Sequence, residues 1–180
     1  MRIADVASGR FPRSREVVWG GSALLAGTML FALGFALASH RVSGSMDRSA
    51  MIEANGARVM PFDQNKTTHI FQKAGDGGIE LVVAKDAQDQ QQIALIRSHL
   101  QEEATKFTQG NYEDPARIHG MDMPGLRELE VGYGRVEVVY ADLPNGANIT
   151  YTSSDPELVE AIHAWFGRQL ADHGAHATGG

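Results

Sequence analysis

The sequence predicts an α+β fold in which one N-terminal transmembrane helix precedes a small domain. The domain is expected to contain a four-stranded antiparallel sheet with two helices on one face. Three observations predict this fold. An uncharged stretch of 23 residues lies near the N-terminus. After it, apolar and polar residues alternate in two pairs of short segments, which is typical of strands. Each pair is followed by apolar residues at helical spacing, which gives the order ββα-ββα.

The chain of 180 residues is accordingly expected to have five segments. They are a cytoplasmic segment at 1–16, a transmembrane helix at 17–39, a linker at 40–67, an α+β domain at 68–174 and a C-terminal tail at 175–180.

The charge on either side of the apolar stretch predicts its orientation. Residues 1–16 contain four arginines and two acidic residues, whereas residues 40–180 contain twelve basic and twenty acidic residues. The positive-inside rule therefore places the N-terminus in the cytoplasm and the domain on the periplasmic side of the inner membrane. A cleaved signal peptide is the alternative, because Ala36-Leu37-Ala38 has the form of a cleavage site. The stretch is longer than a signal core of about 7–15 residues, which favours a retained helix in the bilayer.

Small residues form a stripe along the predicted transmembrane helix. Gly20, Gly27 and Gly34 recur every seven residues, and Ala23 lies beside them in a small-xxx-small pair with Gly27. Such residues allow a neighbouring helix to approach closely in lipid. The expected partners are transmembrane helices of other subunits, although glycine is common in membrane helices for other reasons.

The first half of the domain predicts two strands and a helix. Residues 69–73 and 79–84 alternate as strands do, and Asp76-Gly77-Gly78 supplies a turn. The helix is expected over 88–109, where Gly110 ends it. Its apolar stripe consists of Ile93, Ile96, Leu100, Ala104 and Phe107.

The second half repeats this order. Strands are expected at 135–141 and 147–152, joined by Pro144-Asn145-Gly146. Asp155 is placed to cap a helix that begins at Pro156 and ends at Gly174. The intervening segment, 110–134, shows no clear period and is expected to be irregular.

Composition excludes several classes of function. The chain has no cysteine, so it has no disulfide, no thiolate metal site and no cysteine nucleophile. The acidic domain repels phosphate backbones, which argues against nucleic acid as a partner. No catalytic motif is present: Gly75-Asp76-Gly77-Gly78 precedes a strand rather than the helix that a phosphate loop requires. Acidic residues are scattered and are interpreted mostly as a solvated face. We therefore do not expect an enzyme.

The seven histidines are the candidate ligands. His119 lies close to Met121 and Met123, and imidazole with thioethers is a ligand set suited to copper. Alternatively, Met123 fills the core and His119 caps a neighbouring element. His99 and His163 flank the apolar stripes of the two helices, where a histidine more often satisfies a backbone carbonyl than binds a metal.

Several short motifs are distributed through the domain. They are Val59-Met60-Pro61-Phe62, Thr68-His69-Ile70-Phe71, Gly77-Gly78, Ile96-Arg97-Ser98-His99-Leu100, Asp114-Pro115-Ala116-Arg117-Ile118-His119-Gly120, Met123-Pro124-Gly125-Leu126, Ile162-His163-Ala164-Trp165-Phe166 and Asp172-His173-Gly174. With these motifs, residues 59–174 resemble a group of small exported bacterial proteins that commonly carry the label aspartate carbamoyltransferase. The label does not fit the chain, which lacks the Ser-Thr-Arg-Thr-type helix start and the second domain of a carbamoyl-phosphate site.

The resemblance implies a shared histidine site. Five histidines fall on matching motifs, whereas His40 and His176 do not, and Met121 falls where the motif varies. The five are His69, His99, His119, His163 and His173. If they form one site, His69 must face the helix-covered side of the sheet together with Phe71. Ring nitrogens that do not bind the metal are then expected to donate to carbonyls or to a carboxylate such as Asp122 or Asp172.

Two functions follow as expectations. The first is a non-catalytic, membrane-anchored periplasmic accessory subunit of a larger membrane complex, of the respiratory or photosynthetic type. It rests on the small-residue stripe and on the absence of catalytic motifs. The second is a periplasmic protein that binds copper or zinc through the five histidines.

Overall fold

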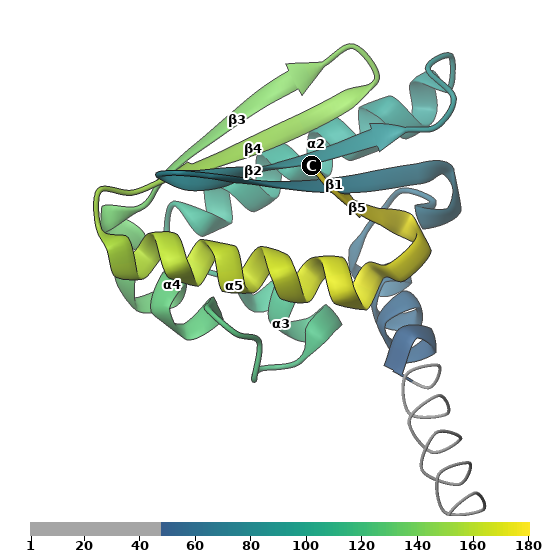
Figure 1. Ribbon diagram of the computed structural model, residues 1–180. Helices are drawn as coiled ribbons and strands as arrows, with labels where there is room; N and C mark the ends of the chain where they lie inside the picture. Colours follow the sequence, from purple (N-terminus) through teal and green to yellow (C-terminus); the bar gives the residue numbers. More distant parts are fainter. Residues whose placement is uncertain (1–47) are drawn as a thin grey trace, which may run out of the picture. The chain divides into compact units, whose positions relative to one another are not determined.

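The computed structural model describes residues 48–180, in which helices and strands alternate along the chain (Figure 1). The segments predicted at 1–16 and 17–39 lie outside the described residues. So do Gly20, Ala23, Gly27 and Gly34, on which the predicted helix packing depends. Within residues 48–180, no helix is long and apolar enough to cross a membrane.

The sheet has the strand order β3-β4-β2-β1-β5. Its strands are β1 (Thr67–Ala74), β2 (Gly77–Ala84), β3 (Glu137–Leu143), β4 (Gly146–Thr152) and β5 (Ala177–Gly179). The first four pair antiparallel, as the alternation predicts. The fifth strand pairs parallel with β1, so the sheet is mixed rather than wholly antiparallel. The expected tail at 175–180 thus contributes to the 3-10 helix η3 (Gly174–His176) and to β5.

Two long helices cover one face of the sheet, as the repeated ββα order predicts. They are α2 (Gln90–Phe107) and α5 (Pro156–His173). Each begins at an aspartate whose side chain accepts a hydrogen bond from the backbone of the first turn. The core between helices and sheet is rich in fully buried large side chains. They include Ile93, Ile96, Ile149, Tyr151, Ile162, Trp165 and Phe166.

The hydrophobicity of β2 suggests that Ile79 and Leu81 face the core, but the register turns Glu80 toward the core instead. Register places Glu80 opposite Phe71 on β1 and opposite Ile149 on β4, so all three side chains face the helices. The more apolar positions Ile79 and Leu81 point to the other face, where they are only partly buried. A carboxyl group therefore enters the core from the centre of the sheet.

Helices also occur in the linker and in the segment that connects the two halves of the domain. Residues 48–59, within the expected linker, form a helix that continues through Gly56, and the 3-10 helix η1 (Gln64–Lys66) follows it. The glycine is suited to this position because a Cβ atom there would lie 2.6 Å from the Cε of Met60.

The expectation that the connection at 110–134 is irregular is wrong. It contains α3 (Glu113–His119), α4 (Leu126–Gly132) and the 3-10 helix η2 (Tyr133–Arg135). The two α-helices have seven residues each, too few for a periodic pattern to be recognisable, and are stabilised by buried side chains. Gly125, at φ +81, brings the start of α4 so close to α5 that a Cβ atom would lie 2.1 Å from the carbonyl oxygen of Ala161. This close approach also brings α3 against α5, where the histidines meet.

Candidate functional site

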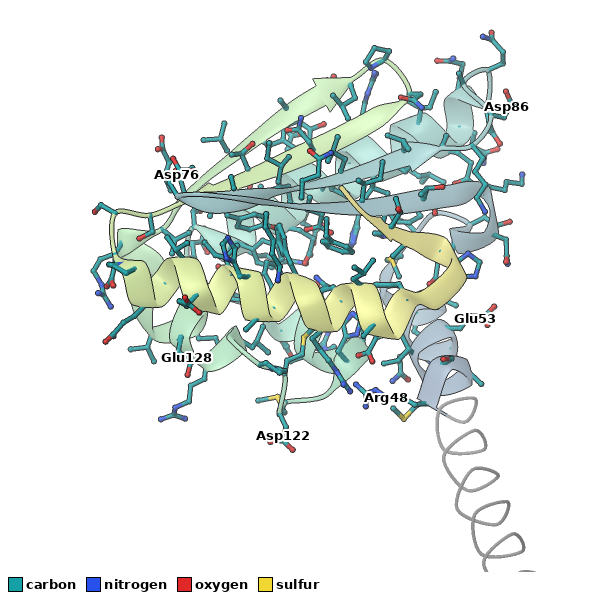
Figure 2. The ribbon with its side chains drawn as sticks, viewed as in Figure 1. Arg48, Glu53, Asp76, Asp86, Asp122 and Glu128 are labelled. Atoms are coloured by element: carbon teal, nitrogen blue, oxygen red, sulfur yellow. The ribbon has the colours of Figure 1, made fainter. Side chains whose placement is uncertain are left out.

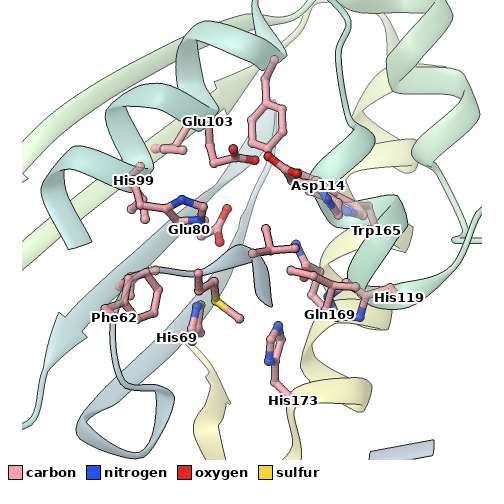
Figure 3. A pocket seen from close by; sticks show the side chains of 18 residues that line it. Phe62, His69, Glu80, His99, Glu103, Asp114, His119, Trp165, Gln169 and His173 are labelled. Carbon is pink, nitrogen blue, oxygen red and sulfur yellow. The ribbon is translucent and has the colours of Figure 1, made fainter. Parts of the chain in front are cut away.

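A cavity of about 50 Å³ lies between the sheet and the helices (Figure 3). Four of the five histidines expected to form a site line this cavity: His69 from β1, His99 from α2, His119 from α3 and His173 from α5. We call it the histidine cavity. The segments that supply these residues are widely separated in the sequence, so only the folded sheet and helices bring them together.

Local structure explains how each ring reaches the cavity. His69 alternates with Thr67 and Phe71 on the helix-covered face of β1, as predicted. His119 and His173 are the last residues of α3 and α5. Carbonyl groups at these helix ends are not used within the helix, which favours side chains that can donate hydrogen bonds.

Three of the rings are in close proximity. The ring centroids of His69 and His173 lie 4.8 Å apart with the planes inclined by 7°, and those of His119 and His173 lie 5.0 Å apart with the planes nearly perpendicular. All three residues are less than a tenth exposed. His99 packs edge-on against Phe62, 5.7 Å between ring centroids.

The imidazoles are uncharged at neutral pH. Burial lowers the pKa of His69 well below its ordinary value of 6.5, and the nearby His173, His99, His119 and His176 lower it further. Burial likewise lowers the pKa of His173 to about 4, with His119 adding to the effect. A neutral imidazole keeps one ring nitrogen with a free lone pair, which is the form that binds a metal ion.

A buried carboxylate orients one of the rings. The Nδ1 atom of His119 donates to Asp172, 3.0 Å away; Asp172 also accepts from Arg48 at 2.7 Å and forms an ion pair with Arg168 at 3.1 Å. Since Nδ1 carries the proton, the Nε2 atom of His119 carries the lone pair. A carboxylate that accepts from the second ring nitrogen is the usual support of a metal-binding histidine. Of the two aspartates that the sequence suggested for this role, Asp172 makes the contact, whereas Asp122 lies on the surface away from the cavity (Figure 2).

The carboxyl groups of Glu80, Glu103 and Asp114 also line the histidine cavity. The sequence analysis did not identify them as part of the site. Burial raises the pKa of Glu80 to about 7, although the hydroxyl of Tyr151 donates to it at 3.1 Å. Burial raises the pKa of Glu103 to about 7 as well. Lys106 binds Glu103 at 2.9 Å and Asp114 at 2.6 Å. The expectation that acidic residues mostly form a solvated face is wrong for Glu80 and Glu103.

The cavity also contains polar atoms without a partner. Among the buried side-chain atoms of residues 48–180, the Nδ1 of His69 and the Nε1 of Trp165 make no hydrogen bond. A buried polar group left unpaired costs about 1–3 kcal/mol. A ligand that binds the Nδ1 of His69 would recover that cost.

The remaining candidates lie elsewhere. The Nε2 atom of His163 lies 2.9 Å from the carbonyl oxygen of Ala74 and 2.8 Å from that of Gly77, so this histidine fastens α5 to the turn between β1 and β2. Met121 is 75 % exposed, whereas Met123 is buried in the core. Neither of these two methionines lines the histidine cavity, although Met60 does, and the amide of Gln169 lies there beside the imidazoles and carboxyl groups.

The donor atoms do not converge on a single point. In the part of the chain that the structure describes, no three His, Asp or Glu side chains are arranged to hold a metal ion. The rings of His69 and His173 stack in parallel, so at least one of them must rotate before both can bind the same ion. Whether the five predicted ligands act as such stays a prediction.

Comparisons with known proteins identify no relative. No family model matches the chain, and neither a curated protein nor a solved structure matches it. The resemblance to small exported bacterial proteins therefore rests on the sequence motifs alone.

Proposed function

We propose that the domain binds a transition metal ion, copper or zinc, in the histidine cavity. The observation that carries this proposal is the sharing of one small cavity by four histidines, three of them buried and His99 partly buried, whose pKa values are all lowered. Neutral imidazoles are ligands for Zn²⁺ and Cu²⁺, and no thiolate is present to favour a softer ion.

The size of the cavity favours an ion over an organic ligand. Its volume is about 50 Å³. Pockets for organic molecules of drug-like size are commonly about 300–1,000 Å³, whereas a single water needs roughly 10–15 Å³. The cavity therefore suits one ion with a few bound waters.

The spacing of three rings supports His69, His119 and His173 as ligands. An imidazole nitrogen binds zinc at about 2.0–2.1 Å, so two ring centroids on one tetrahedral ion are roughly 5 Å apart. The observed separations of 4.8 Å and 5.0 Å fit this value. Rotation of the rings about their side-chain bonds is then the change that binding requires. His99 or one of the nearby carboxyl groups is available as a further ligand, because a bound dication lowers the pKa of a neighbouring carboxyl.

The test is a titration of the full-length protein in detergent, freed of metal with a chelator, at pH 7.5. We expect calorimetry with Zn²⁺ or Cu²⁺ to show one ion bound per chain. Loss of a group that only supports a ligand can lower metal affinity by roughly 100-fold. Loss of a ligand itself should lower the affinity further, so His173→Ala should weaken binding by at least that factor.

His163→Ala is the matched control, because His163 lies outside the histidine cavity and binds backbone carbonyls. This variant should bind the ion with the stoichiometry of the wild type. Equal affinity of the wild type and His173→Ala would show that the cavity is not the metal site.

A second proposed function is that of a non-catalytic accessory subunit of a membrane complex. The supporting observation is the face of the sheet opposite the helices, which is partly buried to exposed and on whose strands Glu137 is the charged residue. Its apolar residues are Ile70, Ile79, Leu81, Val83 and Val139. The native mass of the complex solubilised from membranes should then exceed that of the chain alone, and a mass equal to that of one chain would exclude this function.

Both functions are proposed for a domain anchored on the periplasmic side of the inner membrane. The arginine excess before residue 17 and the uncharged stretch at 17–39 support that placement.

A further inference from the structure

A second cavity, of about 210 Å³, adjoins the histidine cavity. It lies between the helix at 48–59 and the C-terminal end of α5. Its lining residues are Ser49, Ile52, Glu53, Gln64, Asp172, His173, Gly174 and His176. His173 lines both cavities, and the neighbouring Asp172 holds His119 of the first one. The two cavities therefore meet at the end of α5.

The residues that line this second cavity range from exposed at one side to buried at the other. Glu53 and Gly174 are exposed, His176 is partly buried, and Asp172 and His173 are buried. The cavity thus leads from solvent to the ring of His173. Figure 2 shows Glu53 on the outer surface of the helix at 48–59.

The chain bends sharply at the end of α5 to bring His176 into the second cavity. Gly174 adopts φ +51 and ψ −116, a conformation that a residue with a side chain rarely adopts, and η3 follows directly. The Nδ1 atom of His176 is buried without a hydrogen-bond partner. His176 and His173 line the second cavity together.

We propose that this second cavity is a vestibule through which a divalent metal ion reaches the histidine cavity. The inference rests on the metal-binding function proposed above. Glu53 and His176 bind the hydrated ion first, and each replaces one of its waters. His173 then binds the ion from the vestibule side and, by rotation of its ring, presents it to His69 and His119.

The charges around the vestibule fit a cation. Arg48 and Arg168 direct their donors to Asp172, and neither residue lines the vestibule. The carboxylate of Asp172 is thereby neutralised, so that among residues 48–180 Glu53 supplies the exposed carboxylate that lines the vestibule. An exposed carboxylate at the opening raises the rate at which cations arrive.

Suppose that a side chain contacts the ion only on its way to the final site. Its replacement then changes the rate constants for binding and for release by the same factor. We expect the double variant Glu53→Gln/His176→Ala to bind and to release Cu²⁺ roughly tenfold more slowly, which is the lower end of the effect of electrostatic steering. Its equilibrium dissociation constant should stay within about threefold of that of the wild type.

Quenching of Trp165 fluorescence by Cu²⁺ in a stopped-flow instrument supplies the association rate, because Trp165 lines the histidine cavity. The full chain is used in detergent, with Trp19→Phe in every variant so that Trp165 is the only tryptophan. Dissociation is followed by adding excess chelator. The matched control is Glu128→Gln/His163→Ala, which removes the same two residue types; Figure 2 shows Glu128 at the opposite end of the domain from Glu53.

The possible results separate the vestibule from the metal site itself. Slower binding and release with an unchanged dissociation constant, absent from the control, supports the vestibule. If the double variant follows the wild-type rates, the vestibule is wrong although the metal site stands. If it loses affinity only through faster release, His176 or Glu53 is a ligand of the final site, and the vestibule is again wrong. If Cu²⁺ does not quench the wild type, the proposed metal-binding function fails.

Discussion

Replacing Asp172 by alanine is expected to lower the free energy of unfolding by about 3 kcal/mol. The side chain of Asp172 is only 3 % exposed, accepts hydrogen bonds from Arg48 and His119, and forms an ion pair with Arg168. Its removal leaves three donors without an acceptor at the junction of α3, α5 and the helix at 48–59. The value lies at the low end of the range for a broken buried pair, because both arginine side chains are 34 % exposed and can turn toward water.

Urea denaturation at pH 7.5, followed by circular dichroism, measures this loss. The matched control is Asp142→Ala, because Asp142 also pairs with an arginine, Arg97 at 3.7 Å, but is 59 % exposed. We expect the control to change the free energy of unfolding by less than about 1 kcal/mol. Similar losses in the two variants would contradict a special role for the buried pair.

Asp172 also affects the support of the proposed metal site. The helix at 48–59 contacts His119 through Arg48, which donates to the backbone carbonyl of His119 at 3.2 Å as well as to Asp172. A change in the position of this helix therefore changes the support of a proposed ligand. The helix is the first described element after the segment predicted to cross the membrane.

Strong periodicity explains which parts of the fold the sequence predicted. The strands around the two turns and both long helices were predicted to within about two residues, because each combines a regular apolar pattern with a turn or a capping residue. The strand β5 was not predicted. Its three residues, Ala177–Gly179, are too few to show alternation, and they form a strand only because β1 offers an unpaired edge.

The candidate site was predicted only in part, for a similar reason. Motifs singled out His69, His99, His119 and His173, which the structure brings together, but they also included His163, which binds two carbonyls instead. His176 was missed because its position depends on the bend at the end of α5.

The buried glutamates were missed because a charged residue in an alternating strand normally faces water. The register of β2 between β1 and β4, which no local pattern specifies, turns Glu80 inward. Glu103 lies at the edge of the apolar stripe of α2, where burial depends on α3, a helix that the sequence did not predict.

The metal-free protein is expected to be most stable near pH 6.5 and to lose about 2–4 kcal/mol of its free energy of unfolding between pH 6.5 and 5. The lowered pKa values of four histidines are the cause, because the unfolded chain binds protons below pH 6.5 that the folded chain does not. Each group contributes a slope of at most about 1.4 kcal/mol per pH unit, until the pH reaches its folded-state pKa. For His173 that pKa is about 4.

Two glutamates that line the histidine cavity, Glu80 and Glu103, oppose this trend. Burial raises the pKa of Glu80 and Glu103 to about 7, so between pH 4.5 and 7 the folded chain holds protons that the unfolded chain has released. Their contribution to stability is present at low pH and is lost as the pH rises through 7. The four histidines outnumber the two glutamates, and the net stability therefore falls on the acid side. Asp114 and Asp172 have lowered pKa values and titrate below this range.

Two substitutions should change the acid slope in opposite directions. His173→Phe keeps a ring stacked beside His69 and Phe71 but removes a titrating group, so the fall in stability below pH 6.5 should become shallower by up to about 1.4 kcal/mol per pH unit. Glu80→Gln still accepts from Tyr151 but removes an opposing group, so the fall should become steeper by a similar amount. Urea denaturation in the presence of a chelator, at half-unit steps from pH 4.5 to 8, measures all three slopes. If both variants keep the wild-type slope, then neither His173 nor Glu80 changes its affinity for protons on folding, and the buried imidazoles of the histidine cavity are not held neutral by the fold.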